Sequence, residues 1–244
     1  MRGKMLKGTA LLLALLLMIP CVMAEESGKQ EEDMENTNVP AYEFPKGFCY
    51  VSDVIPDAII EMRYATDYNF TGKVVDGYEG NFAIMTIEAA NALKEAADEF
   101  REMGYTIKVY DAYRPLSAVR AFVKWSESPR ETSMKEIFYP EYDNKTLLVD
   151  QGYIARNSSH CRGSALDMTL VDADGNELDM GTCFDYFGNL AWHGAKKITE
   201  EQTANRELLC KVMEKHGFRP FEKEWWHYRL SNEPFSTSFD FPVR

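Results

Sequence analysis

The chain has 244 residues, of which 45% are hydrophobic and 13% aromatic, enough to bury the core of one sizeable domain. Its formal net charge at pH 7 is −12. This charge argues against nucleic acid and anionic membrane surfaces as partners, because both are bound through basic patches. It does not restrict small zwitterionic ligands, whose binding depends on local charge.

The first 24 residues predict a signal peptide for export to the periplasm or the extracellular space. Three basic residues open it: Arg2, Lys4 and Lys7. An apolar run over residues 10–19 follows, and a cleavage region ends at Ala24. Because this run is too short to span a bilayer comfortably, we expect no stable membrane insertion after cleavage. The alternative is a lipid anchor on Cys21, although no small residue stands just before that cysteine.

Residues 25–41 are polar and rich in Glu and Asp, which predicts a disordered acidic linker. A single folded domain is expected over residues 42–244. Within it, helical spacing of apolar residues covers residues 86–103, 116–125 and 201–216. Gly104 and Gly217 are placed to end the first and the third of these helices.

Strand-like alternation covers residues 105–111 and 166–170, and the second strand turns Asp167 to the face opposite its apolar residues. The Trp-rich segment that follows the last helix is also strand-like, whereas residues 129–150 are irregular and predict a long surface excursion. Helices and strands thus alternate irregularly, without a phosphate-binding glycine loop. This pattern favours the α+β class over a doubly wound sheet.

Two of the four histidines stand in segments that also contain a carboxylate. One is the segment SSHCRGSALD at residues 158–167, and the other is EWWHY at residues 224–228. His160, Asp167 and His227 together supply two imidazoles and a carboxylate, the ligand set of a catalytic zinc site with one position left for water. His160 and Asp167 are seven residues apart, too far for one helical face. A turn at Gly163 between a loop histidine and a strand carboxylate would bring them together.

Glu224 lies three residues before His227 and is not needed as a ligand, so it is the candidate general base for the attacking water. On a regular strand these two positions face opposite ways, so we expect a twist or bend between them. The remaining histidines have no comparable neighbours. His216 is expected at the end of a helix, in a structural role, and His193 is a candidate for a position near the site.

The pattern SxHxxGxAxD followed by ExWH resembles the metallopeptidases that cleave D-Ala-D-Ala bonds of the bacterial cell wall. More narrowly, the chain is similar to the VanX-type D-alanyl-D-alanine dipeptidases, from about residue 50 to residue 229. Six stretches carry this resemblance: residues 63–66, 69–73, 111–115, 158–170, 179–185 and 224–228. It implies a D,D-peptidase/hedgehog-like fold, with a central, largely antiparallel sheet, packed helices and the zinc site in a cleft on the sheet.

The resemblance also implies roles for individual residues. The zinc ligands, one ion per chain, are His160, Asp167 and His227, and the general base is Glu224. Arg114 matches the arginine that stabilises the oxyanion, a role that suits the fixed N–H donors of a guanidinium. Asp185 is placed to bind the substrate ammonium, with Asp179 as the nearby alternative, and Ser158 is the candidate for the substrate carboxylate. The implied reaction is hydrolysis of D-Ala-D-Ala to free D-alanine.

Two features depart from the family pattern. VanX-type enzymes are generally cytoplasmic, whereas this chain carries a predicted export signal. The signal motivates an alternative, a D,D-carboxypeptidase or endopeptidase that trims peptidoglycan stem peptides. A wall-binding module without activity is a third hypothesis, which the presence of Glu224 disfavours. Cysteines also occur inside two motifs, at positions 161 and 183, and with Cys49 and Cys210 they leave free thiols and disulfides equally open.

Overall fold

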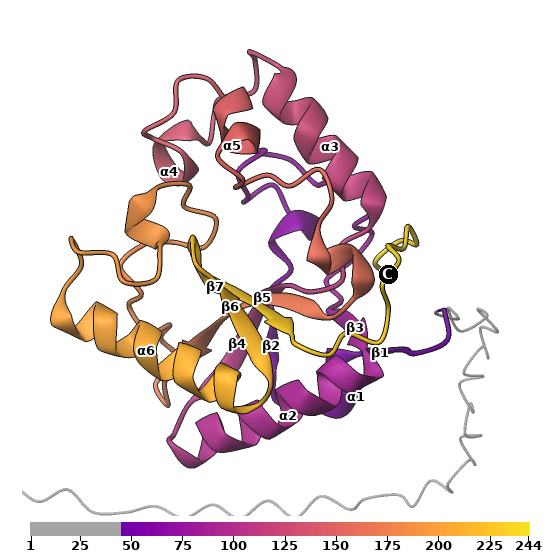
Figure 1. Ribbon diagram of the computed structural model, residues 1–244, viewed down its shortest axis with the longest axis vertical. Coiled ribbons are helices and arrows are strands. Elements are labelled where there is room, and N and C mark those ends of the chain that lie inside the picture. Colours follow the sequence, from indigo (N-terminus) through magenta and orange to yellow (C-terminus); the bar gives the residue numbers. More distant parts are fainter. Residues whose placement is uncertain (1–44) are drawn as a thin grey trace, which may run out of the picture. The chain divides into compact units, whose positions relative to one another are not determined.

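The computed structural model describes residues 45–244, and the predicted signal peptide 1–24 and linker 25–41 lie outside this range. The central feature is a mixed five-stranded sheet in the order β2-β4-β5-β7-β6 (Figure 1). Its strands are β2 (Ile59–Ile60), β4 (Thr106–Asp111), β5 (Ala165–Val171), β6 (Phe218–Phe221) and β7 (Glu224–Leu230). Only the β2–β4 pair is parallel. The predicted α+β fold with a largely antiparallel sheet is confirmed.

Two long helices, α2 (Ile87–Glu102) and α6 (Glu200–Lys215), pack against each other and against the sheet (Figure 1). The Thr86 hydroxyl caps the start of α2 by accepting the Ala89 N–H at 3.3 Å. Both helices are followed by glycines with positive φ, Gly104 at 89° and Gly217 at 85°. The periodicity over residues 86–103 and 201–216 therefore predicted both helices correctly.

On the other side of the sheet lie α3 (Leu116–Glu127), α4 (Lys135–Phe138) and α5 (Thr146–Asp150), in the upper part of Figure 1. The prediction of an irregular surface excursion over residues 129–150 was wrong in part, because α4 and α5 are helical and Tyr139 and Leu148 are buried. Helices of four and five residues are too short to show a period in sequence. Packing, such as the Tyr139 ring against Trp125 at 5.4 Å, stabilises them instead.

The remaining elements of the described range are a small second sheet, one short α-helix and three single-turn helices. A two-stranded sheet pairs β1 (Phe48–Tyr50) with β3 (Ile84–Thr86), and α1 (Val51–Val54) follows β1. Three single-turn helices are η1 (Arg63–Ala65), η2 (Ser159–Arg162) and η3 (Asn189–Ala191). Among residues 45–244, no helix combines the length and the apolar composition needed to cross a bilayer.

Strand β5 lies at the centre of the sheet, and all seven of its residues are buried. Leu166, Met168 and Leu170 belong to the hydrophobic core. Asp167 points to the opposite face, as the alternation predicted, yet it is only 2% exposed. Because both faces of this strand are covered, its polar side chains must find partners inside the protein.

Candidate metal centre

Three adjacent strands place acidic and imidazole side chains in one row across the sheet. Asp167 on β5 is directly opposite Asp111 on β4 on one side and His227 on β7 on the other. Residues paired in this way project from the same face of a sheet. A register shift between Val109 and Asp111 on β4 brings Asp111 into the row. The sheet thus assembles residues separated by more than 100 positions in sequence.

His160 reaches this row from the turn of η2. The turn begins at Ser158, whose hydroxyl accepts the His160 N–H at 3.3 Å, and it closes at Gly163 with φ 77°. A side chain at Gly163 would place its Cβ 2.3 Å from the Phe48 ring, so only glycine fits there. The His160 Nδ1 lies 2.6 Å from the carbonyl oxygen of Ala112 and donates to it. This bond leaves the lone pair of Nε2 facing the row.

The three predicted ligands converge on a common point. His160 Nε2 lies 3.0 Å from His227 Nδ1, His227 Nδ1 lies 2.9 Å from Asp167 Oδ1, and His160 Nε2 lies 3.4 Å from the same oxygen. Zinc bonds of about 2.0–2.2 Å in a tetrahedron put ligand atoms about 3.3–3.6 Å apart. The donor atoms are therefore close to the spacing that zinc requires, and their types fit the ion. Within residues 45–244, this is the group of His, Cys, Asp and Glu side chains that could hold a metal ion.

Burial and neighbouring groups shift Asp167 and His227 toward their metal-binding forms. Burial alone would raise the pKa of Asp167, but the two imidazoles beside it, those of His160 and His227, hold it below its usual range. Burial lowers the pKa of His227, against the opposing attraction of Asp167. An ionised carboxylate and a neutral imidazole are the states that bind a metal.

Arg114 is fixed beside the row by Asp111, a carboxylate that the sequence motifs alone do not mark as functional. The Nε and Nη2 atoms of Arg114 each lie 2.8 Å from Asp111 Oδ2, and Nη2 lies 3.4 Å from Asp167 Oδ2. The guanidinium also lies over the Tyr64 ring, 5.1 Å from its centre. Asp111 is fully buried and accepts a further bond from the Tyr78 hydroxyl at 2.5 Å. In the sequence, only the position of Asp111 three residues before Arg114 suggests a contact between them. The strand register shows that Asp111 also lies beside Asp167.

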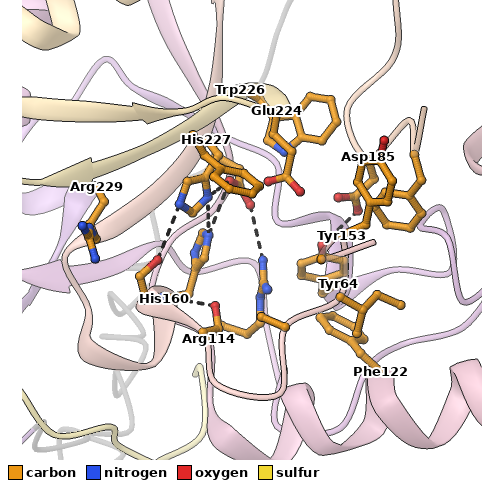
Figure 2. Close-up of a pocket in the computed structure, with 18 of the residues that line it drawn as sticks. Tyr64, Arg114, Phe122, Tyr153, His160, Asp185, Glu224, Trp226, His227 and Arg229 are labelled. Atoms are coloured by element: carbon orange, nitrogen blue, oxygen red, sulfur yellow. Dashed lines mark hydrogen bonds and ion pairs between the residues drawn. The ribbon is translucent and has the colours of Figure 1, made fainter. Parts of the chain in front are cut away.

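Glu224 and His227 line the same cleft because β7 is irregular between them. Pairing with β6 is regular from Phe218 to Pro220 and then shifts, so that Phe221 lies opposite Glu224. This irregularity is the bend that the sequence required. Figure 2 shows the Glu224 carboxylate between His227 and Asp185. Burial raises the pKa of Glu224 well above its ordinary value, and the charges of Asp167 and Asp185 raise it further.

The residues expected to bind substrate divide into two groups. Asp185 lines the cleft, is 4% exposed and accepts a bond of 2.9 Å from the Tyr64 hydroxyl. Ser158 also lines the cleft. Asp179 does not: it is exposed, and its carboxylate accepts bonds from Gly181 N–H at 2.8 Å and from the Gln202 side chain at 2.9 Å. Asp179, the alternative assignment, therefore lies outside the cleft; its carboxylate caps the turn at residues 179–181 and binds Gln202 of α6.

The other candidates lie outside the cleft. His216 is at the end of α6 and pairs with Glu99 at 2.7 Å, as its predicted structural role requires. His193 does not line the cleft, and a backbone hydrogen bond links it to the turn before the strand of the site: its N–H donates to the carbonyl oxygen of Glu222 at 2.9 Å. Burial lowers the pKa of His193 to about 4. The four cysteines within residues 45–244 are free thiols, so the structure contains no disulfide there.

The cleft has a volume of about 320 Å³ and contains the three ligands, Glu224, Arg114, Asp185 and Ser158. Two imidazoles and a carboxylate beside an unligated carboxylate and a fixed guanidinium define the site of a metal-dependent hydrolase. The model of peptidase family M15, described as D-ala-D-ala dipeptidase, matches residues 45–244. The chain therefore belongs to this family, as the motifs indicated.

Three relatives that bear the name D-alanyl-D-alanine dipeptidase are similar to the chain over nearly their whole length. The protein of Enterococcus faecium is 41% identical over 200 residues, which cover 81% of this chain and 98% of the relative. That of Enterococcus faecalis is 42% identical over 199 residues, with the same coverage of 81% and 98%. That of Streptomyces coelicolor is 36% identical over 198 residues, which cover 80% and 98%.

Proposed function

We propose that this protein is a zinc-dependent dipeptidase that hydrolyses D-Ala-D-Ala to two molecules of D-alanine. The observation that carries the proposal is the cleft itself. It combines the converging ligands His160, Asp167 and His227 with Glu224 on one side and Arg114 on the other. The names of the relatives, which the chain matches over 98% of their length, support this substrate.

One zinc ion, held by the three ligands, would polarise the peptide carbonyl and make water nucleophilic at neutral pH. The residues of the chain do the rest. Glu224 accepts a proton from the attacking water and returns it to the nitrogen of the leaving D-alanine. Arg114 donates N–H bonds to the oxygen of the scissile carbonyl as negative charge develops there. Its two contacts with Asp111 hold it in place before the substrate arrives.

Asp185 supports a free dipeptide as the substrate. Its carboxylate lies in the cleft with a bond from Tyr64, and its φ of 62° shows a backbone conformation that non-glycine residues rarely adopt. Burial and the charge of Asp167 raise the pKa of Asp185 well above its ordinary value, against the opposing charge of Arg114. A substrate ammonium would add a positive charge beside this carboxyl group. A stem peptide carries an acyl group at this point and cannot.

Comparison of two substrates tests this proposal. Purified protein is incubated with D-Ala-D-Ala or with a stem pentapeptide that ends in D-Ala-D-Ala, and released D-alanine is measured. We expect efficient release from the dipeptide and loss of activity with a chelator. Preference for the pentapeptide would favour the carboxypeptidase alternative. Undiminished turnover after exhaustive chelation, or binding without turnover, would contradict a zinc dipeptidase.

We also propose that the enzyme is exported, on the evidence of the predicted signal peptide over residues 1–24. Its substrate would then be dipeptide or peptidoglycan-derived peptide outside the cytoplasm. Cleavage after Ala24 predicts a mature chain that starts at Glu25. Sequencing the N-terminus of protein recovered from cell fractions checks this, and a lipid on Cys21 would reveal the anchored alternative.

A further inference from the structure

Arg229 lies on the metal-binding strand, and its position places it in the cleft. It follows His227 by two residues on β7, and it pairs with Ala165 as His227 pairs with Asp167. Residues two apart on a strand project from the same face, about 6.8 Å apart. Arg229 accordingly lines the same cleft as the metal ligands.

The charge of Arg229 is only partly compensated by the protein. The nearest carboxylate is Glu233, whose oxygen lies 3.5 Å from Arg229 Nη1. Both oxygens of Glu233 already accept bonds from Arg162, at 2.7 Å and 2.8 Å. Two guanidiniums thus share one carboxylate, which leaves one positive charge at this end of the cleft. Since the Arg229 side chain is 41% exposed, its N–H donors remain accessible to a ligand.

The cleft is therefore polarised along its length. Figure 2 shows Arg229 on one side of His160 and His227 and Asp185 on the other. Ser158 lines the cleft as well, and its oxygen accepts the His160 N–H, so its hydroxyl hydrogen is available to donate. A dipeptide has the same polarity, with an ammonium at one end, a carboxylate at the other and the scissile carbonyl between them.

We propose that Arg229 binds the C-terminal carboxylate of the substrate, with Ser158 as a second donor. This inference rests on the proposed dipeptidase function. The path from the scissile carbonyl carbon to the carboxylate carbon is three bonds, no more than about 4.3 Å, and a charge-assisted hydrogen bond adds about 2.8 Å. A donor that binds this carboxylate therefore lies within about 7.1 Å of the scissile carbon, and Arg229 stands one strand repeat of about 6.8 Å from the ligand His227. Arg162 does not take this role, because Glu233 occupies its fork.

Recognition of the two substrate termini would determine which peptide bonds are cleaved. A peptide bond that is followed by further residues carries no free carboxylate at this position, so Arg229 selects the last bond of a chain. Asp185 at the other end selects a free ammonium. Together Arg229 and Asp185 favour a substrate with both termini free, which is a dipeptide. An internal bond of peptidoglycan has neither a free carboxylate nor a free ammonium beside it.

The test uses wild-type enzyme and the variants Arg229→Ala, Arg229→Lys and Arg219→Ala. Each is assayed on D-Ala-D-Ala and on its C-terminal amide, with kcat and KM determined separately. Arg219 is the matched control, because it has the same charge and pairs with Arg229 across β6 and β7 but does not line the cleft. Zinc content and thermal unfolding verify that each variant is folded.

For Arg229→Ala we expect a KM for the dipeptide about 10–100-fold higher, the range for one hydrogen bond to a charged group. We expect kcat within about threefold of wild type and no added effect on the amide. Arg229→Lys should fall between, and Arg219→Ala should match wild type. Equal losses on both substrates would overturn the inference, and so would equal kcat/KM of the wild-type enzyme on dipeptide and amide. Failure of wild type to cleave either substrate would overturn the proposed function and this inference with it.

Discussion

Replacement of Glu224 by glutamine separates the chemistry of the cleft from its folding. Among the described carboxylates of the cleft, Asp167 is engaged by both imidazoles and Asp185 by Tyr64, which leaves Glu224 to accept a proton from water. Glutamine keeps the shape but cannot accept that proton. General base catalysis contributes about 10²–10⁴-fold, or about 2.7–5.4 kcal/mol of activation free energy. With no other free carboxylate among the described residues that line the cleft, we expect a loss of kcat near the upper value.

The same substitution should stabilise the metal-free protein at pH 7. Burial and the neighbouring Asp167 and Asp185 charges raise the pKa of Glu224, so ionisation of this carboxyl is less favourable in the folded than in the unfolded chain. A carboxyl with a raised pKa lowers stability at every pH above its unfolded value of about 4.3. Glutamine removes this cost, so Tm measured in chelator should rise.

The assay combines D-alanine release, zinc content by mass spectrometry and thermal unfolding of the metal-free protein. A merely structural role for Glu224 beside Trp225 and Trp226 predicts the opposite pattern, with altered stability and intact turnover of the folded fraction. If the Glu224→Gln enzyme retains about one zinc per chain and works within about threefold of wild type, the mechanism is refuted.

Three further substitutions examine Arg114 and His227 in the cleft and Glu177 outside it. Arg114→Lys should lower kcat by about 10²–10³-fold, as for loss of an oxyanion donor, and leave zinc content unchanged; a loss below threefold would remove Arg114 from the mechanism. His227→Ala should weaken the metal site itself, so activity should be lost and partly return with added zinc, whereas full zinc occupancy would contradict ligation. Burial would raise the pKa of Glu177, but hydrogen bonds from Lys108 at 2.7 Å and Tyr110 at 2.6 Å hold it below its ordinary value. Glu177→Gln should therefore lower Tm at pH 7, and the difference from wild type should shrink as pH falls from about 4.3 through the lowered pKa; a difference independent of pH would contradict this.

The sequence by itself determined the elements and motifs that depend on local patterns. Apolar spacing located α2, α3 and α6, and alternation located β4 and β5, because each of these elements is long enough to repeat its period. The donor types at His160, Asp167 and His227 indicated the metal site, since few other functions require such side chains at that spacing. The need for a bend between Glu224 and His227 also followed from strand geometry alone.

Only the tertiary structure decided which side chains meet. The β4–β5–β7 register aligns Asp111 with Asp167 and His227, and no local pattern in the sequence encodes a pairing between strands so far apart. The division of Asp185 from Asp179 has the same origin: the two are six residues apart in one loop, and tertiary packing turns one into the cleft and the other toward Gln202. No sequence motif distinguishes Arg229 from a surface arginine. Its proposed role in binding the substrate carboxylate follows from the strand face that it shares with His227 and from the two hydrogen bonds by which Arg162 occupies Glu233.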